Sequence, residues 1–527
     1  MTPLIQTLQN PELYDHPIEK FEVVETHISL VLLTGSYVYK IKKPVNFGFL
    51  DFSTLEKRRH YCEEELRLNS RLAPHLYVDI VAITGSVDHP QLNGSGQVVE
   101  YAVRMRQFPQ RAQLDLMLAA GQLGGDIIDR LADRVAMFHL EIDATEANQY
   151  FGDFDHIRQP MTENFSQISD AVKDPSQKTG LDEIERWTLQ QLDSLMPLIR
   201  LRKDQGFVRE CHGDMHLRNI AWWHNEIVIF DCIEFNPNLY WIDVMSEIAF
   251  LVMDLEDRQQ NQLAQRFLNR YLEITGDYEG LKLLRMYKVY RALVRAKVEA
   301  LRSVQEQAGS EEYKQSMQVF RQYLDLATGY LKPIQPLLII NFGLSGAGKS
   351  FISRQLAELL PAIQLRSDVE RKRIYNIAAT EQSSQEQQRW LYSREATDKT
   401  YARLLAIATV LLDGGYSVVI DAANLKKIAR QTFVELAQAK QVPYLILAFE
   451  AEKGILSERI EHRVHKGEDA SDATLAVLEQ QILTMEALTQ EELEHAIVLD
   501  TGAKLDIDGL CKQIQYAYSA NTNCSSL

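Results

Sequence analysis

The sequence has no long apolar stretch, and we expect neither a signal peptide nor a cysteine framework. Its longest apolar runs, such as LLAIATVLL from Leu404, are far shorter than the ~20 residues that span a bilayer. The N-terminal segment has neither the basic nor the apolar block of a signal peptide. The five cysteines are scattered and odd in number, which favours reduced thiols over disulfides or a zinc site. These absences predict a cytoplasmic protein that does not enter a membrane.

Positive charge is also scarce, with 56 Lys and Arg against 73 Asp and Glu and a net charge of −17. Broad nucleic-acid binding needs a basic surface, so this balance argues against it. A narrow basic pocket for a phosphorylated ligand remains compatible with the charge. The length of 527 residues exceeds what one hydrophobic core supports, which indicates more than one domain.

The clearest domain boundary lies near residues 329–336, where two prolines interrupt a helical pattern before the apolar segment LLIINF. Residues 1–330 begin with strand-like segments and continue with helical ones, which predicts a two-lobed α+β domain. Residues 335–515 alternate apolar strands with helices, as in a doubly wound parallel α/β sheet. Residues 516–527 are predicted to form a disordered tail.

The most specific motif is GLSGAGKS at residues 343–350, which matches G-x-x-x-x-G-K-[ST] at each fixed position. Such a loop binds phosphates through backbone N–H groups and the start of the following helix. Lys349 would reach the β- and γ-phosphates of ATP, and the Ser350 hydroxyl would hold Mg²⁺. The residues expected to bind ATP here are Gly343, Ser345, Gly346, Ala347, Gly348, Lys349 and Ser350.

Two aspartates follow later strands of this region. Asp368 lies just past the second strand, where a carboxylate can accept the proton of an attacking hydroxyl. Arg371, one helical turn further on, could hold a phosphate of the acceptor. Asp421 ends the strand SVVID and could orient Mg²⁺ through water. The alternatives are a helix N-cap for Asp368, a surface position for Arg371 and a strand-end turn for Asp421.

Arg459 and Arg463 are four residues apart and therefore share one helix face. They would either close over the transferring phosphates as a lid that contacts ATP or form a solvated surface. Residues 335–515 contain four distinctive segments: GLSGAGKS, the D-x-x-R of Asp368–Arg371, VIDAANLKKIAR and ERIEHRVHKGEDASDATLAVLEQQ. Through these segments, the region resembles the P-loop kinases related to polynucleotide 5′-hydroxyl kinases and zeta toxins. That resemblance implies ATP at the P-loop, the aspartate as base and the lid arginines on phosphate.

A second constellation lies in HGDMHLRN and the following IFDCIEF. The segments IAWW and EIVIF form a hairpin that brings Asn219 close to Asp231, and two such oxygen donors suit Mg²⁺. Asp214, in the loop before the hairpin, is placed to accept a hydroxyl proton. His212 either shapes this loop or is an ordinary buried histidine. Glu234 is either a further metal ligand or part of a structural salt bridge.

These motifs resemble the aminoglycoside phosphotransferase and choline kinase-like families, over about residues 20–325. The resemblance implies a protein-kinase-like fold that phosphorylates small-molecule hydroxyls with Mg·ATP, Asp214 as base, and Asn219 and Asp231 as magnesium ligands. It also requires a strand lysine that contacts ATP, for which we favour Lys40 over Lys42. The carboxylate partner of this lysine lies on the next helix, where we choose Glu65 among three consecutive glutamates. The TGSY turn supplies one glycine only, Gly35, and so departs from a glycine-rich loop that covers phosphates.

Arg291 and Arg295 share a face of a later predicted helix that also carries Lys297. They either line an acceptor pocket for an anionic substrate or balance nearby acids on a solvated face.

The sequence therefore predicts a bifunctional ATP-dependent phosphotransferase with a small-molecule hydroxyl acceptor at the N-terminal domain. In one alternative, a single domain catalyses and the other binds nucleotide and regulates. In another, the C-terminal domain is a nucleic-acid 5′-hydroxyl kinase or a toxin that phosphorylates a nucleotide-sugar. The acidic charge disfavours nucleic acid as a partner without excluding it for that domain.

Overall fold

The computed structural model describes residues 3–48, 50–146, 149–172, 175–379, 381, 383–466 and 470–524. Contacts divide the chain into two compact units. The N-terminal unit comprises Met1–Asp257 and Met286–Thr328, and the P-loop unit comprises Arg258–Arg285 and Gly329–Leu527. This division differs from the predicted boundary at residue 330, because residues 258–285 pack with the P-loop unit.

A six-stranded antiparallel sheet forms the first part of the N-terminal unit, in the order β1-β2-β3-β6-β4-β5. The predicted hairpin at TGSY joins its strands β2 and β3, and the helix α2 (Leu55–Ser70) begins at the N-cap Thr54. Apolar side chains of alternate positions, including Leu30, Leu32, Tyr39 and Ile41, form a core on one face of the sheet. The strands are β1 (Glu22–Glu25), β2 (Ser29–Leu33), β3 (Tyr37–Lys42), β4 (Tyr77–Gly85), β5 (Pro90–Leu92) and β6 (Val98–Arg106).

The rest of the N-terminal unit is largely helical. Two short ribbons interrupt the helices, β7 (Val208–Glu210) with β10 (Trp241–Asp243), and β8 (Ile220–Trp223) with β9 (Glu226–Ile229). The second ribbon is the predicted hairpin. The helices are α1 (Pro3–Thr7), α3 (Leu114–Ala119), α4 (Gly125–Glu141), α5 (Phe154–Ala171), α6 (Pro175–Asp204), α7 (Val244–Asp257), most of α9 (Leu281–Gln305) and most of α10 (Glu311–Tyr330).

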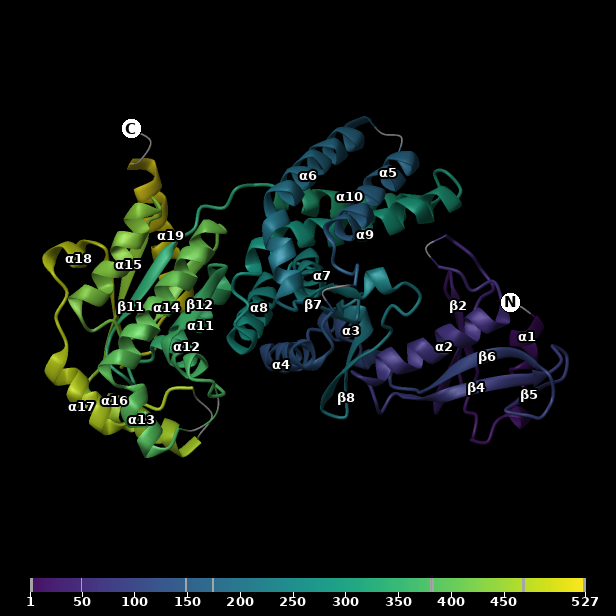
Figure 1. Cartoon of the computed structure of the whole chain (residues 1–527), viewed down its shortest axis with the longest axis horizontal. Coiled ribbons are helices and arrows are strands. Elements are labelled where there is room, and N and C mark those ends of the chain that lie inside the picture. The colour runs from purple at the N-terminus through teal and green to yellow at the C-terminus, as the bar shows by residue number, and fades with distance from the viewer. Residues whose placement is uncertain are drawn as a thin grey trace. The chain divides into compact units, whose positions relative to one another are not determined.

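The P-loop unit contains a five-stranded parallel sheet in the order β12-β13-β11-β14-β15, of which Figure 1 labels β11 and β12. Its strands are β11 (Leu338–Phe342), β12 (Ala362–Arg366), β13 (Ser417–Asp421), β14 (Tyr444–Glu450) and β15 (Ala496–Asp500). The two-domain fold class is thus confirmed, with an α/β sheet in this unit. The strand order changes direction beside β11, because β12 and β13 lie on one side of it and β14 and β15 on the other. In open parallel sheets, ligands bind at the carboxyl ends of the strands at such a point.

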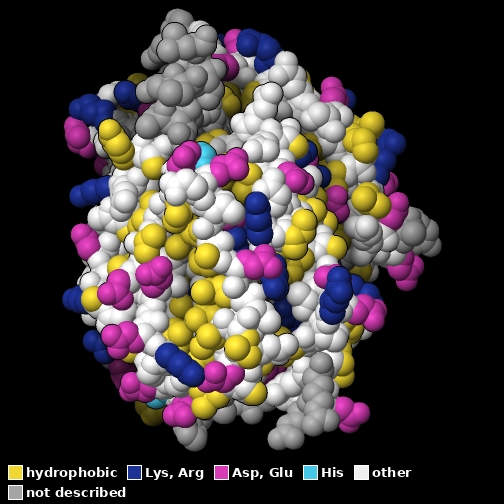
Figure 2. Space-filling model, turned by 90° about the vertical axis from the view of Figure 1, so that its left-hand side faces the viewer, with side chains coloured by type: hydrophobic (Ala, Val, Ile, Leu, Met, Phe, Trp, Pro, Cys, Tyr) yellow, Lys and Arg dark blue, Asp and Glu magenta, His cyan; other side chains and the backbone are white. Residues whose placement is uncertain are grey.

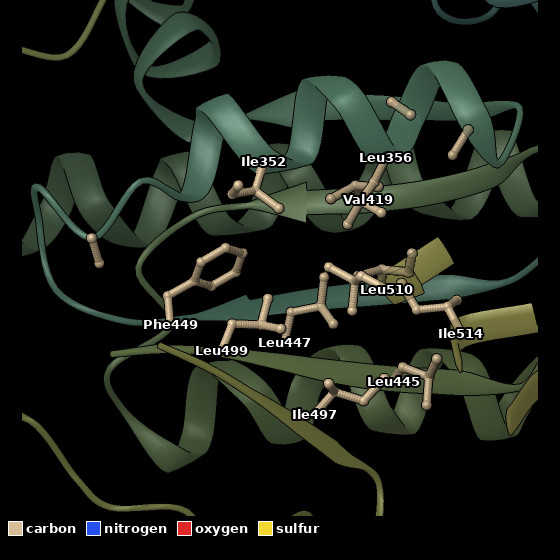
Figure 3. Packing of buried hydrophobic residues seen from close by; sticks show 14 of the residues in the cluster. Ile352, Leu356, Val419, Leu445, Leu447, Phe449, Ile497, Leu499, Leu510 and Ile514 are labelled. Carbon is tan, nitrogen blue, oxygen red and sulfur yellow. The ribbon is translucent and has the colours of Figure 1, made fainter. Parts of the chain in front are cut away.

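Helices cover the sheet of the P-loop unit. Figure 3 shows Ile352 and Leu356 of α11 packed close to Val419 of β13, with Leu510 and Ile514 of α19 in the same cluster. Burying a side chain of this size contributes about 1.5–3 kcal/mol, so this cluster fixes α11 on the sheet. The helices are α8 (Asn261–Thr275), α11 (Lys349–Leu359), α12 (Ser367–Ile374), α13 (Gln385–Leu391), α14 (Arg394–Asp413), α15 (Lys427–Ala439), α16 (Lys453–Lys466), α17 (Leu475–Thr484), α18 (Gln490–Glu494) and α19 (Ile507–Cys524).

Residues 516–527, which we predict to form a disordered tail, are helical over most of their length. Helix α19 continues through residues 516–524, while 525–527 lie outside the described residues. Leu510 and Ile514 anchor the helix in the core, and Ala517 packs against the same cluster. Among the described helices, none combines the length and apolarity that a membrane crossing requires.

Candidate active sites

The loop between β7 and the β8–β9 hairpin places Asp214 and Asn219 together in the N-terminal unit. The Asn219 side-chain amide donates to both the main-chain carbonyl and the carboxylate of Asp214, each at 3.0 Å. Gly213 has φ +87°, and a Cβ atom there would lie 2.7 Å from the carbonyl oxygen of Leu239. A glycine is therefore required immediately before Asp214. The hairpin pairs Ile220 with Ile229, so Asn219 and the segment leading to Asp231 lie at the same end of it.

Lys40 joins this site from the six-stranded sheet. Its ammonium lies 2.5 Å from Asp231 and 2.8 Å from Glu65 of α2. Burial alone lowers the pKa of Lys40, but the nearby carboxylates of Asp231, Glu65 and Glu234 outweigh it and raise the pKa well above its usual value. Lys40, Glu65 and Asp231, which we predict to bind ATP or metal, come from separate segments of the chain. Their charged groups therefore lie together in the structure. Glu64, the neighbouring alternative to Glu65, pairs with Arg67 instead.

The Lys42 ammonium lies 2.7 Å from the second carboxylate oxygen of Glu65 and also pairs with the carboxylate of Glu234. Both Lys42 and Glu234 are almost fully buried. Glu234 was predicted to be either a metal ligand or part of a salt bridge. The structure shows the salt bridge, because the Glu234 carboxylate pairs with the Lys42 ammonium. The single-glycine turn is held by the Gln107 side chain, which accepts a hydrogen bond from the Gly35 N–H at 2.9 Å.

Two buried residues that the sequence did not single out for these roles hold the Asp214 loop. The carboxylate of Glu247 on α7 accepts hydrogen bonds from the N–H groups of His212 and Gly213, at 2.6 and 2.9 Å. Arg291 on α9 donates to the Gly213 carbonyl at 3.0 Å and to Ser246. Arg291 is 5% exposed, so it supports the loop rather than lining an open acceptor pocket. The signal for Glu247 was a lone acid within the otherwise apolar run VMSEIAFLVM.

His212 shapes the loop through both ring nitrogens. Nδ1 lies 3.2 Å from the Asp214 N–H, and Nε2 lies 2.8 Å from the Phe230 carbonyl. Burial lowers the pKa of His212, which favours a neutral ring that accepts at Nδ1 and donates at Nε2. Burial raises the pKa of Asp214, but His216, which also hydrogen-bonds to the carboxylate, and Arg295 outweigh it and hold the pKa below its usual range. Asp214 is therefore an ionised carboxylate.

The P-loop in the second unit lies between β11 and α11. Gly346 has φ +83°, and a Cβ atom there would lie 2.7 Å from the Leu456 carbonyl oxygen, so this position requires glycine. The Lys349 ammonium donates to the carbonyls of Gly343 and Leu344 at 3.0 and 2.8 Å. Burial lowers the pKa of Lys349 to about 8. The Ala347 side chain faces the core, and its N–H donates to the Leu344 carbonyl at 3.2 Å.

Asp421, at the end of β13, lies beside the start of α11. Its carboxylate accepts hydrogen bonds from Gln364 at 2.9 Å and from Asn341 at 3.3 Å, and it also contacts the Ser350 hydroxyl. Burial raises the pKa of Asp421. A hydroxyl and a carboxylate oxygen placed together match the oxygen ligands that Mg²⁺ prefers.

One cavity of about 800 Å³ collects the predicted residues of the P-loop unit. On α12, Arg371 donates to Asp368 at 3.1 Å. On α16, Arg459 donates to the carbonyl of Thr501 at 2.6 Å, and Arg463 donates to the carbonyl of Ala473 at 2.8 Å. The predicted residues that line the cavity are Ser345, Gly346, Gly348, Lys349, Ser350, Asp368, Arg371, Asp421, Arg459 and Arg463.

Comparison with protein families assigns both regions. Residues 34–284 match the family model described as "Phosphotransferase enzyme family". Residues 338–488 match the model described as "AAA domain". The chain is thus similar to phosphotransferases over its first part and to AAA domains over its second. The predicted resemblance to phosphotransferase and P-loop kinase families and the predicted enzyme class of kinase are confirmed.

Relatives are found in Mycobacterium bovis and Mycobacterium tuberculosis, under the names "Uncharacterized protein Mb2027c" and "Uncharacterized protein Rv2004c". Each is 29% identical over 468 residues, which cover 88% of this chain and 91% of the relative. The match therefore includes residues of both domains.

Similar solved structures include an amicoumacin kinase in complex with AMP-PNP, Ca²⁺ and its ligand Ami (13% identity, 62% of this chain and 96% of that chain, TM-score 0.38). Choline kinase from Cryptosporidium parvum is 14% identical over 62% of this chain and 94% of its own, with a TM-score of 0.37. A gluconokinase from Sinorhizobium meliloti is 19% identical over 35% of this chain and 98% of its own, with a TM-score of 0.24.

Proposed function

We propose that the protein is a bifunctional ATP-dependent phosphotransferase in which each domain transfers the γ-phosphoryl group of Mg·ATP to a hydroxyl acceptor. One observation carries the proposal: in each unit, a lysine, a base candidate and metal-ligand candidates from separate segments come together. In the N-terminal unit these are Lys40, Asp214, Asn219 and Asp231. In the P-loop unit these are Lys349, Asp368, Ser350 and Asp421.

In the N-terminal unit, Asp214 would accept the proton of the acceptor hydroxyl as the new O–P bond forms. Its low pKa and its hydrogen bond from Asn219 keep the carboxylate ionised and oriented for this role. Lys40 would contact the ATP phosphates, while Glu65 holds the Lys40 ammonium in place. Asn219 and Asp231 offer the oxygen donors for Mg²⁺, which would neutralise charge on the phosphates.

In the P-loop unit, the backbone N–H groups of residues 343–348 and the start of α11 would bind the phosphates. Lys349, Arg459 and Arg463 add positive charge along the same cavity. Ser350 and Asp421 would hold Mg²⁺, and Asp368 would accept the acceptor's proton. Because such reactions depend mainly on positioning and on charge stabilisation, a cavity that holds all of these groups supports phosphoryl transfer.

A small-molecule acceptor fits the charge of the protein better than a polynucleotide does. On the face shown in Figure 2, acidic and basic side chains are interspersed rather than gathered by sign. The net charge of −17 points the same way. We place the protein in the cytoplasm as part of this proposal, since ATP and reduced thiols are available there.

The test is phosphoryl transfer from γ-labelled ATP to a metabolite extract and to 5′-hydroxyl oligonucleotides. Wild type is compared with Asp214→Ala and Lys349→Ala. We expect each variant to lose a different labelled product, or one of them to accumulate an intermediate. Loss of all activity in Lys349→Ala and none in Asp214→Ala would instead show that the N-terminal domain is a nucleotide-binding regulator.

A further inference from the structure

The cavity of the P-loop unit extends beyond the residues assigned to ATP and Mg²⁺. Its far wall is built by one face of α14 and the first half of α15. Most side chains on this wall are apolar or aromatic, and they follow helical spacing: Tyr401, Ala402 and Leu405 on α14, with Leu425, Ile428, Ala429 and Phe433 on or just before α15. A ligand body that packs there would be largely apolar.

Arg371 stands at the edge of this wall. Its guanidinium lies over the ring of Tyr392, 4.6 Å from the ring centroid, and donates to Asp368 at 3.1 Å. The residue is only 8% exposed. Asp368 is the one hydrogen-bond partner that the described residues provide for Arg371, and its buried Nε–H has no acceptor among them. A guanidinium has five N–H donors, so Arg371 keeps donors beyond the one that Asp368 accepts, and it lines the cavity.

Unsatisfied donors on a buried cation are unfavourable, and native proteins rarely leave them without a partner. The geometry of a guanidinium matches that of phosphate and carboxylate groups, which can accept two parallel hydrogen bonds. The cation also lines the cavity beside Asp368, the candidate base. An anionic group of the acceptor would therefore both satisfy Arg371 and place a neighbouring hydroxyl near Asp368.

The charges along the cavity agree with an anionic ligand in addition to ATP. Among the described residues, five cations line it, namely Lys349, Arg371, Lys426, Arg459 and Arg463, against the three acids Asp368, Asp398 and Asp421. This excess of positive charge contrasts with the net charge of −17 for the whole chain. Local positive potential of this kind concentrates anions at a site.

We propose that the P-loop unit phosphorylates a small molecule that already carries an anionic group, which Arg371 binds, attached to an apolar body that packs against α14 and α15. This inference rests on the proposed function of the P-loop unit and names its acceptor class. In the reaction, the acceptor hydroxyl oxygen forms a bond to the γ-phosphorus of ATP and its proton moves to Asp368. The bond from the γ-phosphorus to the bridging oxygen breaks, and ADP leaves.

Binding of simple probes tests the proposal on the full chain, saturated with Mg²⁺ and the non-hydrolysable analogue AMP-PNP. The probes are phenyl phosphate, which has both features, phenol, which lacks the anion, and inorganic phosphate, which lacks the apolar body. By calorimetry, we expect phenyl phosphate to bind at least about tenfold more tightly than either, since a charged hydrogen-bonded pair typically contributes that much. In Arg371→Met, phenyl phosphate should bind no more tightly than phenol.

Lys426→Met is the matched control. Lys426 is a second cation on the cavity wall, but it is half-exposed and pairs with Glu486 at 3.1 Å. The preference for phenyl phosphate should survive in this variant, because the recognition belongs to Arg371 and not to general positive charge. The proposal is overturned if Arg371→Met and Lys426→Met lose the preference for phenyl phosphate equally. It is also overturned if wild type binds phenol and phenyl phosphate equally, or if it binds none of the probes. A stronger preference for a 5′-hydroxyl oligonucleotide over all three probes would overturn it in favour of nucleic acid.

The proposed ATP site and the proposed acceptor class are tested separately. Binding of AMP-PNP is measured first, in wild type and in Lys349→Ala. If Lys349→Ala binds AMP-PNP as wild type does, the proposed ATP site in this unit is wrong. If binding depends on Lys349 but the probes show no dependence on Arg371, the ATP site stands and only the acceptor class is wrong.

Discussion

The hydroxyl of Tyr278 donates a hydrogen bond to the carboxylate of Glu370 at 3.2 Å. Tyr278 lies in the segment 258–285, which precedes the predicted boundary, whereas Glu370 lies on α12 between Asp368 and Arg371. Glu370 is fully buried and also pairs with Arg373 and Arg403, at 3.1 and 2.6 Å. The helix that carries the candidate base is thus fixed partly by a segment from outside residues 335–515.

We expect Tyr278→Phe to loosen α12 while the rest of the P-loop unit stays folded. The variant removes one hydrogen bond to a buried charge, which typically costs about 1.5–3 kcal/mol. Hydrogen–deuterium exchange should become faster in peptides from α12 than in peptides from β14, which lies on the other side of β11. Tyr444→Phe is the control, because this half-buried tyrosine lies on β14, with its ring centroid 4.6 Å from that of His495 and tilted against it. Unchanged exchange in α12 would show that Arg373 and Arg403 alone hold Glu370.

Lys40 and Lys42 are predicted to have opposite effects on activity and stability. In Lys40→Met, Glu65 keeps its contact with Lys42 and Asp231 is half-exposed, so the fold should tolerate the change. Labelled product from the N-terminal domain should fall by about 100-fold or more, since a charge on the phosphates is lost. In Lys42→Met, Glu234 becomes an unpaired buried charge, which should cost about 3–5 kcal/mol.

The measurements for this pair are thermal unfolding and turnover with Lys349→Ala as the common background, which silences the P-loop unit. A large fall in melting temperature for Lys40→Met with normal activity, or the reverse for Lys42→Met, would exchange the roles of the two lysines.

The sequence does not decide which of Lys40 and Lys42 faces the proposed metal ligand Asp231. Strand alternation places Lys40 and Lys42 on one side, and both in fact reach Glu65, each at one oxygen. The pattern therefore identifies the cluster but cannot tell which lysine faces Asp231. The local context of residues 343–350 was predictable, because an apolar segment before the loop and helical spacing after it indicate the strand β11 and the helix α11 that the structure shows. The packing of residues 258–285 was not predictable, since it depends on contacts such as Asn269 with Ala362, 93 residues away.

Glu247→Gln should slow phosphoryl transfer by the N-terminal domain without preventing nucleotide binding. Both oxygens of Glu247 accept N–H groups of the Asp214 loop, and a glutamine would present its own N–H₂ to one of these donors. The loop should shift and move Asp214 out of position, which we expect to lower kcat by about 10- to 100-fold.

Glu256→Gln is the control on the same helix, because Glu256 pairs with Lys288 at 2.8 Å and not with the loop. Turnover and AMP-PNP titration are measured in the Lys349→Ala background. If the Glu247 variant keeps normal kcat, or if it loses AMP-PNP binding together with kcat, the carboxylate does not act by positioning Asp214.

The pKa of Lys349 predicts opposite effects of pH on stability and on ATP affinity in the P-loop unit. Burial lowers this pKa to about 8 in the folded protein, below its usual value of 10.5. Between these values the unfolded chain binds more protons than the folded one, so stability without nucleotide should rise with pH, by up to ~1.4 kcal/mol per pH unit. The ATP phosphates favour the ammonium form, so ATP affinity should be constant below pH 8 and fall by up to about tenfold per unit above it.

Urea unfolding between pH 7 and 10, with and without Mg·AMP-PNP, measures both effects. The stabilisation by the nucleotide should shrink above pH 8 while the unliganded protein gains stability. Asp231→Ala serves as the background, since it removes a proposed metal ligand from the other site. The same series in Lys349→Met should lose both trends, because methionine does not titrate. If nucleotide stabilisation is flat through pH 8–10 in the Asp231→Ala chain, Lys349 is not the group that binds the phosphates in its charged form.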